Sequence, residues 1–92
     1  DAVSPELDVV VIDDATDLYI PGARISADEI RIALDSDSQG RGTIRVPVHL
    51  LRLRINVSKD GYLPRNDNVD VFSETTVARI RLVRLPGSGA RL

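Results

Sequence analysis

Alternation of apolar and polar residues is the feature of this sequence that most limits its fold. From Leu51 to Ser58, leucine, isoleucine and valine alternate with arginine, asparagine and serine. Side chains two positions apart lie on the same face of a β-strand, so this pattern predicts a strand with one buried face.

Six further segments show a similar alternation or an apolar run, and turn residues separate them. The predicted strands are 7–13, 23–27, 30–34, 43–48, 51–57, 69–71 and 78–82. The apolar phase slips by one position at Asp28-Glu29, which favours two strands joined by a tight turn there. Turn residues at 35–42 predict a hairpin connection, 64–68 predicts a loop, and 73–76 predicts another turn.

The aliphatic composition also favours strands. Hydrophobic residues make up 42% of the 92 residues, but only Tyr19, Tyr62 and Phe72 are aromatic, so valine, isoleucine and leucine must form the core. A chain of this length has room for one domain with one core. We therefore predict an all-β, seven-stranded sandwich whose two sheets bury Val9, Val11, Ile25, Ile32, Ile44, Leu53, Ile55, Val71, Ile80 and Leu82.

The predicted domain covers residues 7–85. Residues 1–6 form an N-terminal extension, and the Pro-Gly-Ser-Gly composition of 86–92 predicts a C-terminal linker or tail. The net charge of -2 provides no bulk attraction to nucleic acid. No apolar run approaches the roughly 20 residues of a membrane span. We therefore expect neither a nucleic-acid partner nor a membrane span.

Three motifs follow one another along the chain. Residues 13–25 place a polar turn and Pro21-Gly22 between two apolar runs, residues 36–41 form a second turn, and Gly61-Tyr62 follows the strand predicted at 51–57. In this order they resemble carboxypeptidase regulatory-like domains. These are small transthyretin-like (prealbumin-like) β-sandwiches whose first two strands are joined by a D-x-x-T-G-x-P-I-P-G-A-x-V pattern. Gly42 stands where that family usually has an aromatic residue.

The resemblance implies an Ig-like or transthyretin-like β-sandwich with structural roles for Gly22, Gly40, Gly61 and Tyr62. It implies that Gly61 has a backbone conformation that other residues resist. It also implies that the Tyr62 ring packs at one end of the sandwich while its hydroxyl finds a partner.

Domains that resemble this one are non-catalytic accessory modules. They bind or position a protein or glycan partner, or act as folding supports and spacers, in secreted proteins, surface proteins and the spikes of type VI secretion machines. The resemblance thus implies contact with other domains of a parent chain and an extracytoplasmic or secreted location.

The residue inventory argues against catalysis. His49 is the only histidine and the chain has no cysteine, so a catalytic triad would depend on one ring, and a zinc site of three or four His or Cys ligands is excluded by count. The transthyretin-like enzymes that hydrolyse hydroxyisourate resemble one another in several histidines and a C-terminal Y-R-G-S signature. This chain has neither, so that alternative is disfavoured, and we predict no enzymatic activity and no cofactor.

A self-made cross-link is a further chemistry to weigh. Gram-positive adhesin domains of similar shape join a lysine in the first strand to an asparagine in the last. Lys59, the only lysine, falls in a predicted loop, and the last predicted strand has no asparagine. We therefore predict no such bond.

The turn at 35–40 raises the question of calcium. The segment from Asp35 through Asp37 to Gly40 has the sequence Asp-Ser-Asp-Ser-Gln-Gly, which matches the first six positions of an EF-hand loop. A weak calcium-binding adhesion domain is therefore an alternative. Val46 stands where the bidentate glutamate belongs, and strands rather than helices flank the turn. The favoured interpretation is a turn whose polar side chains bond nearby backbone N–H groups.

A set of arginines on outward strand positions is the candidate partner-binding surface: Arg45, Arg52, Arg54, Arg79 and Arg81. Arg45 and the Arg52–Arg54 pair fall on consecutive strands that we expect to be neighbours. One interpretation is a solvated face whose arginines pair loosely with acidic residues. The other is a docking face for an acidic protein or glycan.

Overall fold

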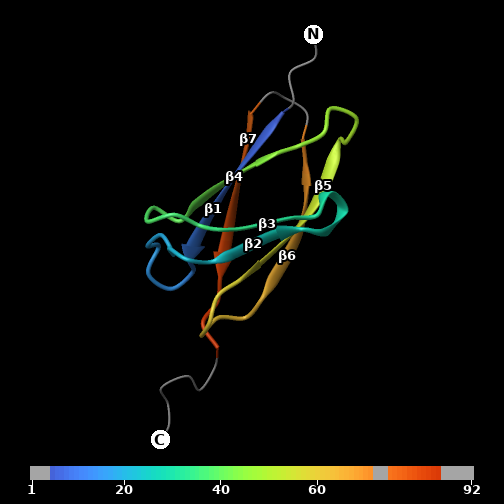
Figure 1. Ribbon diagram of the computed structural model, residues 1–92. Helices are drawn as coiled ribbons and strands as arrows, with labels where there is room; N and C mark the ends of the chain where they lie inside the picture. The colour runs from blue at the N-terminus through green and yellow to red at the C-terminus, as the bar shows by residue number, and fades with distance from the viewer. Residues whose placement is uncertain (1–4, 72–74, 86–92) are drawn as a thin grey trace, which may run out of the picture.

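The computed structural model describes residues 5–71 and 75–85, which form two β-sheets packed face to face (Figure 1). Its elements are β1 (Glu6–Asp13), β2 (Arg24–Ala27), the 3-10 turn η1 (Asp28–Ile30), β3 (Ile32–Asp35), β4 (Arg41–Arg45), β5 (Arg52–Ser58), β6 (Arg65–Asp70) and β7 (Thr75–Leu82). The predicted all-β, seven-stranded sandwich is confirmed. Among the described residues, no helix is long and apolar enough to span a bilayer.

The first sheet, here called sheet A, has the strand order β4-β1-β7. Its central strand β1 is antiparallel to β4 and parallel to β7. The parallel register runs unbroken from Glu6 opposite Thr75 to Asp13 opposite Leu82. Because these strands point the same way, the chain enters the sandwich at one end and leaves it at the other (Figure 1).

The second sheet, sheet B, has the order β3-β2-β5-β6, and all neighbours are antiparallel. η1 joins β2 to β3 at the predicted tight turn, and Arg31 ends it with a left-handed φ of 55°. β5 and β6 form a hairpin whose register runs from Arg52 opposite Asp70 to Val57 opposite Arg65.

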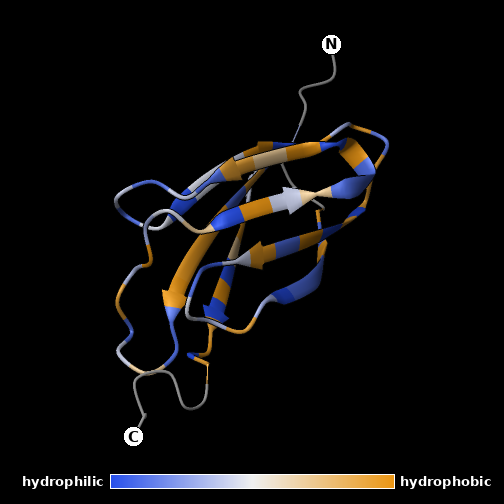
Figure 2. Ribbon diagram, turned by 60° about the horizontal axis from the view of Figure 1, so that its bottom comes forward, coloured by the Kyte–Doolittle hydropathy of each residue, from blue (hydrophilic) through white to orange (hydrophobic). Residues whose placement is uncertain are grey.

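The inward faces of both sheets form one core, and the alternating colours of Figure 2 follow this pattern along the strands. All of the predicted core residues except Ile32 are buried. Ile32 is only partly buried because β3 is an edge strand. On β1 the outward-facing Val10 and Ile12 are also buried, with 5% and 7% of their surface exposed. This strand is therefore covered on both faces.

Gly42 lies on β4 and faces the core. A Cβ atom there would lie 2.9 Å from the Cδ1 atoms of both Ile25 and Leu34. These two side chains occupy the space that an aromatic residue would need, since close-packed cores leave few voids. This packing accounts for glycine at position 42.

Arg65 closes the side of the sandwich where β6 meets β7. Its guanidinium donates a hydrogen bond to the carbonyl oxygen of Arg81 at 3.0 Å and lies 3.3 Å from a carboxylate oxygen of Asp67. β6 and β7 are edge strands of different sheets. Charged side chains at such an edge disfavour pairing with strands of other chains.

Several predictions of local structure are wrong. Residues 35–42 form no hairpin, because β3 belongs to sheet B and β4 to sheet A, so this turn crosses between the sheets. The predicted loop 64–68 lies mostly in β6, where pairing with β5 outweighs its turn-like composition. β4 spans Arg41–Arg45 rather than 43–48.

The predicted turn at 73–76 is wrong for Thr75 and Thr76, which begin β7 because they pair with β1. Its first two residues lie outside the described residues. The predicted linker 86–92 and most of the extension 1–6 lie outside them as well.

Candidate functional site

Asp13 is the centre of a polar cluster at the end of the sandwich where the chain leaves. One of its carboxylate oxygens, Oδ2, accepts hydrogen bonds from the Tyr62 hydroxyl at 2.6 Å and from Arg84 Nε at 2.9 Å. The other, Oδ1, accepts the backbone N–H groups of Ala15 at 2.8 Å and Thr16 at 3.1 Å. The Asp13 side chain is 4% exposed. We call Asp13, Tyr62 and Arg84 the Asp13 clasp.

The clasp holds Asp13 in its charged form. The Tyr62 hydroxyl contributes most to a pKa well below the ordinary value, Arg84 and the two backbone N–H groups add to it, and burial acts in the opposite direction. The carboxylate in turn raises the pKa of Tyr62 and of Arg84. A carboxylate with four donors is poorly suited to exchange protons at neutral pH, so the clasp is a structural device.

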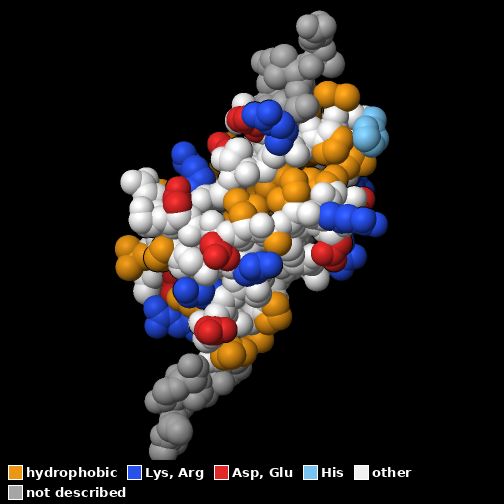
Figure 3. Space-filling model, in the orientation of Figure 1, with side chains coloured by type: hydrophobic (Ala, Val, Ile, Leu, Met, Phe, Trp, Pro, Cys, Tyr) orange, Lys and Arg blue, Asp and Glu red, His pale blue; other side chains and the backbone are white. Residues whose placement is uncertain are grey.

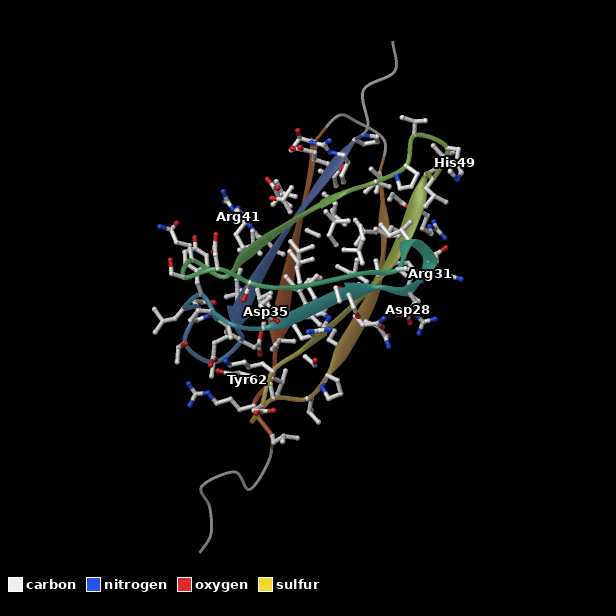
Figure 4. The ribbon with its side chains drawn as sticks, viewed as in Figure 1. Asp28, Arg31, Asp35, Arg41, His49 and Tyr62 are labelled. Carbon is white, nitrogen blue, oxygen red and sulfur yellow. The ribbon has the colours of Figure 1, made fainter. Side chains whose placement is uncertain are left out.

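The clasp joins three segments that are far apart in the sequence. Asp13 ends β1, Tyr62 follows β5, and Arg84 follows β7. Backbone bonds continue the joint: Leu63 N–H donates to Val83 O at 2.8 Å, and Leu85 N–H donates to Gly61 O at 2.9 Å. Figure 4 shows Tyr62 at the lower end of the molecule, near the ends of the strands.

The three glycines with predicted structural roles have left-handed backbones. Their φ angles are 71° for Gly22, 72° for Gly40 and 89° for Gly61. Gly40 is the most constrained, because a Cβ there would lie 2.7 Å from the carbonyl oxygen of Val11. Tyr62 is half-buried against the core, and Asp13 is the partner of its hydroxyl.

The five candidate arginines do not form one face. Arg45, Arg79 and Arg81 lie on sheet A, and Arg52 and Arg54 lie on sheet B. The expectation that β4 and β5 are neighbours is wrong, because the chain crosses from one sheet to the other between them. The arginines therefore divide between two surfaces of the molecule.

Most of these arginines contact acidic residues of the same chain. The shortest ion-pair distances are 3.7 Å from Arg45 to Glu6, 2.8 Å from Arg52 to Asp70, and 2.6 Å from Arg81 to Asp17. The hydrogen bond to Asp17 raises the pKa of Arg81. These contacts agree with the interpretation of a solvated face with loose ion pairs.

Asp37 organises the turn that was weighed as a calcium site. Its Oδ1 accepts the backbone N–H groups of Gln39 at 2.8 Å and Arg41 at 3.0 Å, and these bonds lower its pKa. Asp35 lies on β3 opposite Arg24. Over the described ranges 5–71 and 75–85, no three His, Asp or Glu side chains group closely enough to hold a metal ion. The side chain of Asp37 thus serves the turn itself.

His49 lies in the exposed turn between β4 and β5, at the end of the sandwich opposite Tyr62 (Figure 4). The Asp13 carboxylate and the only imidazole are therefore far apart. Asp13 and His49 therefore do not form the carboxylate–histidine pair of a catalytic triad.

A second polar site lies on the outer face of sheet B and was missed by sequence reasoning. A groove of about 200 Å³ is lined by Asp28, Glu29, Arg54, Asn56 and Asn68. Only Arg54 was among the candidates. The signal that could have identified the site is the presence of asparagines on strands, but part of β6 was read as a loop. Likewise, Arg84 gave no local signal of its contact with Asp13.

Comparisons with known proteins give a likeness of fold. No protein-family model matches the chain, and no curated protein matches it significantly. Among solved structures, it is similar to the group B streptococcus pilus 2b backbone protein, with a TM-score of 0.64 and 10% sequence identity. The match covers 90% of this chain but 42% of that protein. What the two share is the β-sandwich. Membership of the carboxypeptidase regulatory-like family stays a prediction.

Proposed function

We propose that residues 7–85 are a non-catalytic β-sandwich module that holds its two ends at a fixed separation and transmits tension between them. The observation that carries this proposal is the parallel pairing of β1 with β7 over their whole length. The chain enters at the start of β1 and leaves after β7, at opposite ends of the sandwich (Figure 1). Such a module suits a spacer or support within a larger surface or secreted protein.

The direction of the ladder bonds makes sheet A suited to bearing load. Pulling on the two ends draws β1 and β7 past each other along their common axis, so the hydrogen bonds of the ladder share the force. The Asp13 clasp adds side-chain bonds where β1 and β7 end. Separation of the ends therefore requires many contacts to break together.

Two further observations support a module without catalysis. The buried carboxylate of Asp13 is saturated by donors and lies far from His49. The similar solved structure is, by its title, the backbone protein of a pilus. Accessory domains of the carboxypeptidase regulatory-like family, which the motifs resemble, suit the same role.

Distance measurements test this proposal. The chain has no cysteine, so spin labels on Glu6→Cys and Leu85→Cys would be the only labelled sites. We expect one narrow distance of roughly 30 Å between the two labels. Glu6 lies opposite Thr75 at the start of β7, the strand rises about 3.3 Å per residue, and three residues follow it up to Leu85. Glu6→Cys with Val48→Cys is the matched control, because Val46 bonds to Pro5 at the entry end. A broad end-to-end distribution, or one as short as the control, would contradict a fixed spacer.

A further inference from the structure

The outer face of sheet B has an unusual composition for a β-sheet. All three asparagines of the chain lie on its adjacent strands β5 and β6: Asn56 is directly opposite Asn66, and Asn68 is directly opposite Arg54. Asparagine is depleted in strands because its side chain competes for backbone hydrogen bonds. Positions that break a local preference without a packing gain are candidates for function.

Two of these asparagines line the groove of about 200 Å³ together with Arg54 and the acidic residues of η1. The groove exists because β2 ends early: its pairing with β5 stops at Ser26 opposite Asn56. Beyond that point, η1 takes the place of the strand. Glu29 fixes it there, because its carboxylate accepts the backbone N–H of Arg54 at 3.0 Å. The groove thus has one wall from η1 and a floor from β5 and β6.

The outer surface around η1 carries charges of both signs. Figure 4 labels Asp28 and Arg31 on this turn, well away from Tyr62, and Figure 3 shows acidic and basic side chains close together on the same side of the molecule. The groove itself combines two carboxylates with one guanidinium. With two carboxylates and one guanidinium, the lining disfavours an anionic ligand.

The chemistry of the lining indicates the class of ligand. Carboxamides both donate and accept hydrogen bonds, carboxylates accept them and guanidinium donates them. The lining has no apolar side chain. The aromatic anchors that often carry the binding energy of protein interfaces are missing from this lining, whereas its donors and acceptors match those of sugar hydroxyls. We propose that this groove binds a neutral oligosaccharide through Asn56, Asn68, Arg54 and the η1 carboxylates.

Titrations followed by ¹H–¹⁵N NMR test the proposal. Cellohexaose, maltohexaose and chitohexaose serve as separate probes, each up to about 10 mM, which covers a weak site. We expect at least one probe to shift the side-chain amide signals of Asn56 and Asn68 and the backbone signals of η1. If none of the three shifts these signals, the proposal is wrong. A short glutamate-rich peptide that shifts them instead would also overturn it in favour of protein docking.

Variants separate binding from folding. Asn68→Thr and Asn56→Thr replace each carboxamide by a residue that strands prefer. We expect each to weaken the binding of the active probe by about tenfold or more, through lost hydrogen bonds, while the melting temperature is unchanged or higher. Gln39→Ala, which removes an exposed carboxamide from a distant turn, is the matched control and should bind normally. Normal binding by both threonine variants would contradict the assigned site.

Discussion

The outer faces of the two sheets differ in a way that separates support from binding. On sheet A, the outward Val10 and Ile12 of β1 are buried. On sheet B, the outward positions of β5 and β6 are arginine, asparagine, serine and aspartate. One sheet has an apolar stripe at its centre and the other has a polar groove. The outer face of sheet A thus has buried apolar residues at its centre and exposed residues on β4 and β7, whereas the outward positions of β5 and β6 are polar.

The two sheets also differ in how the chain connects their strands. β1 and β7 of sheet A are the strands through which the chain enters and leaves, so force on the ends acts on that sheet first. The strands of sheet B are joined to each other by η1 and by the β5–β6 hairpin. Tests of this comparison follow, from the largest expected effect to the smallest.

The largest effect is expected from a polar residue placed in the apolar stripe of sheet A. Val10→Asn should lower the free energy of unfolding by about 2 to 4 kcal/mol, because a buried carboxamide without partners loses its hydration. The reverse change on sheet B, Asn68→Val, should cost nothing or stabilise slightly. Urea denaturation of both variants measures the two values. Similar losses in both would show that the two faces are equivalent.

The next effect concerns the Asp13 clasp. Tyr62→Phe removes one donor from the buried carboxylate of Asp13 and should cost about 1.5 to 3 kcal/mol, the range for hydrogen bonds to charged groups. Tyr19→Phe is the matched control at the other tyrosine, a residue that is 57% exposed. Its unfolding free energy should equal that of the unmodified chain. An equal loss of unfolding free energy in the two variants would show that the Asp13 clasp does not stabilise the fold.

The clasp also predicts a dependence on acid. Because folding lowers the pKa of Asp13, its contribution to stability is complete above the unfolded value of about 3.9 and is lost as the pH falls toward the folded value. Unfolding free energy measured from pH 7 to pH 2 should therefore fall below about pH 4. Asp13→Asn should be less stable at pH 7 and should show a shallower fall. Parallel curves for the two proteins would mean that other carboxylates set the acid response.

The smallest effect is expected at an exposed ion pair of sheet B. Arg52→Ala breaks the contact with Asp70, but the Arg52 side chain is 67% exposed, so the loss should stay below about 1 kcal/mol. Addition of salt to the unmodified chain should reproduce part of this loss by screening. A loss as large as that for Tyr62→Phe would show that the arginines of sheet B support the fold.

The strands with a strong apolar pattern were predicted correctly from the sequence. β1, β5 and β7 have strong apolar patterns, and the core positions on them followed directly. β6 was missed in part because Arg65–Asn68 has the composition of a loop, and only its pairing with β5 makes it a strand. Whether a turn such as 36–40 closes a hairpin or crosses between sheets depends on contacts that no local pattern contains.

The candidate sites show the same limit. The turn chemistry at Asp13 was readable from its neighbours, but Tyr62 and Arg84 are 49 and 71 positions away. The polar groove was hidden because its residues come from η1, β5 and β6, one of which was read mainly as a loop. Both sites are formed by residues that are far apart in the sequence and are brought together only by the fold.

The central claim, that tension between the two ends is carried by β1 and β7, is tested most directly by single-molecule force measurements in two geometries. Handles at the two ends load the β1–β7 ladder along its axis, whereas handles at residue 5 and at Arg45→Cys peel β4 from β1 one bond at a time. Forced unfolding reports the barrier along each direction of pulling. The account predicts a clearly higher unfolding force between the two ends. Equal forces in the two geometries, or a lower force between the ends, would contradict it.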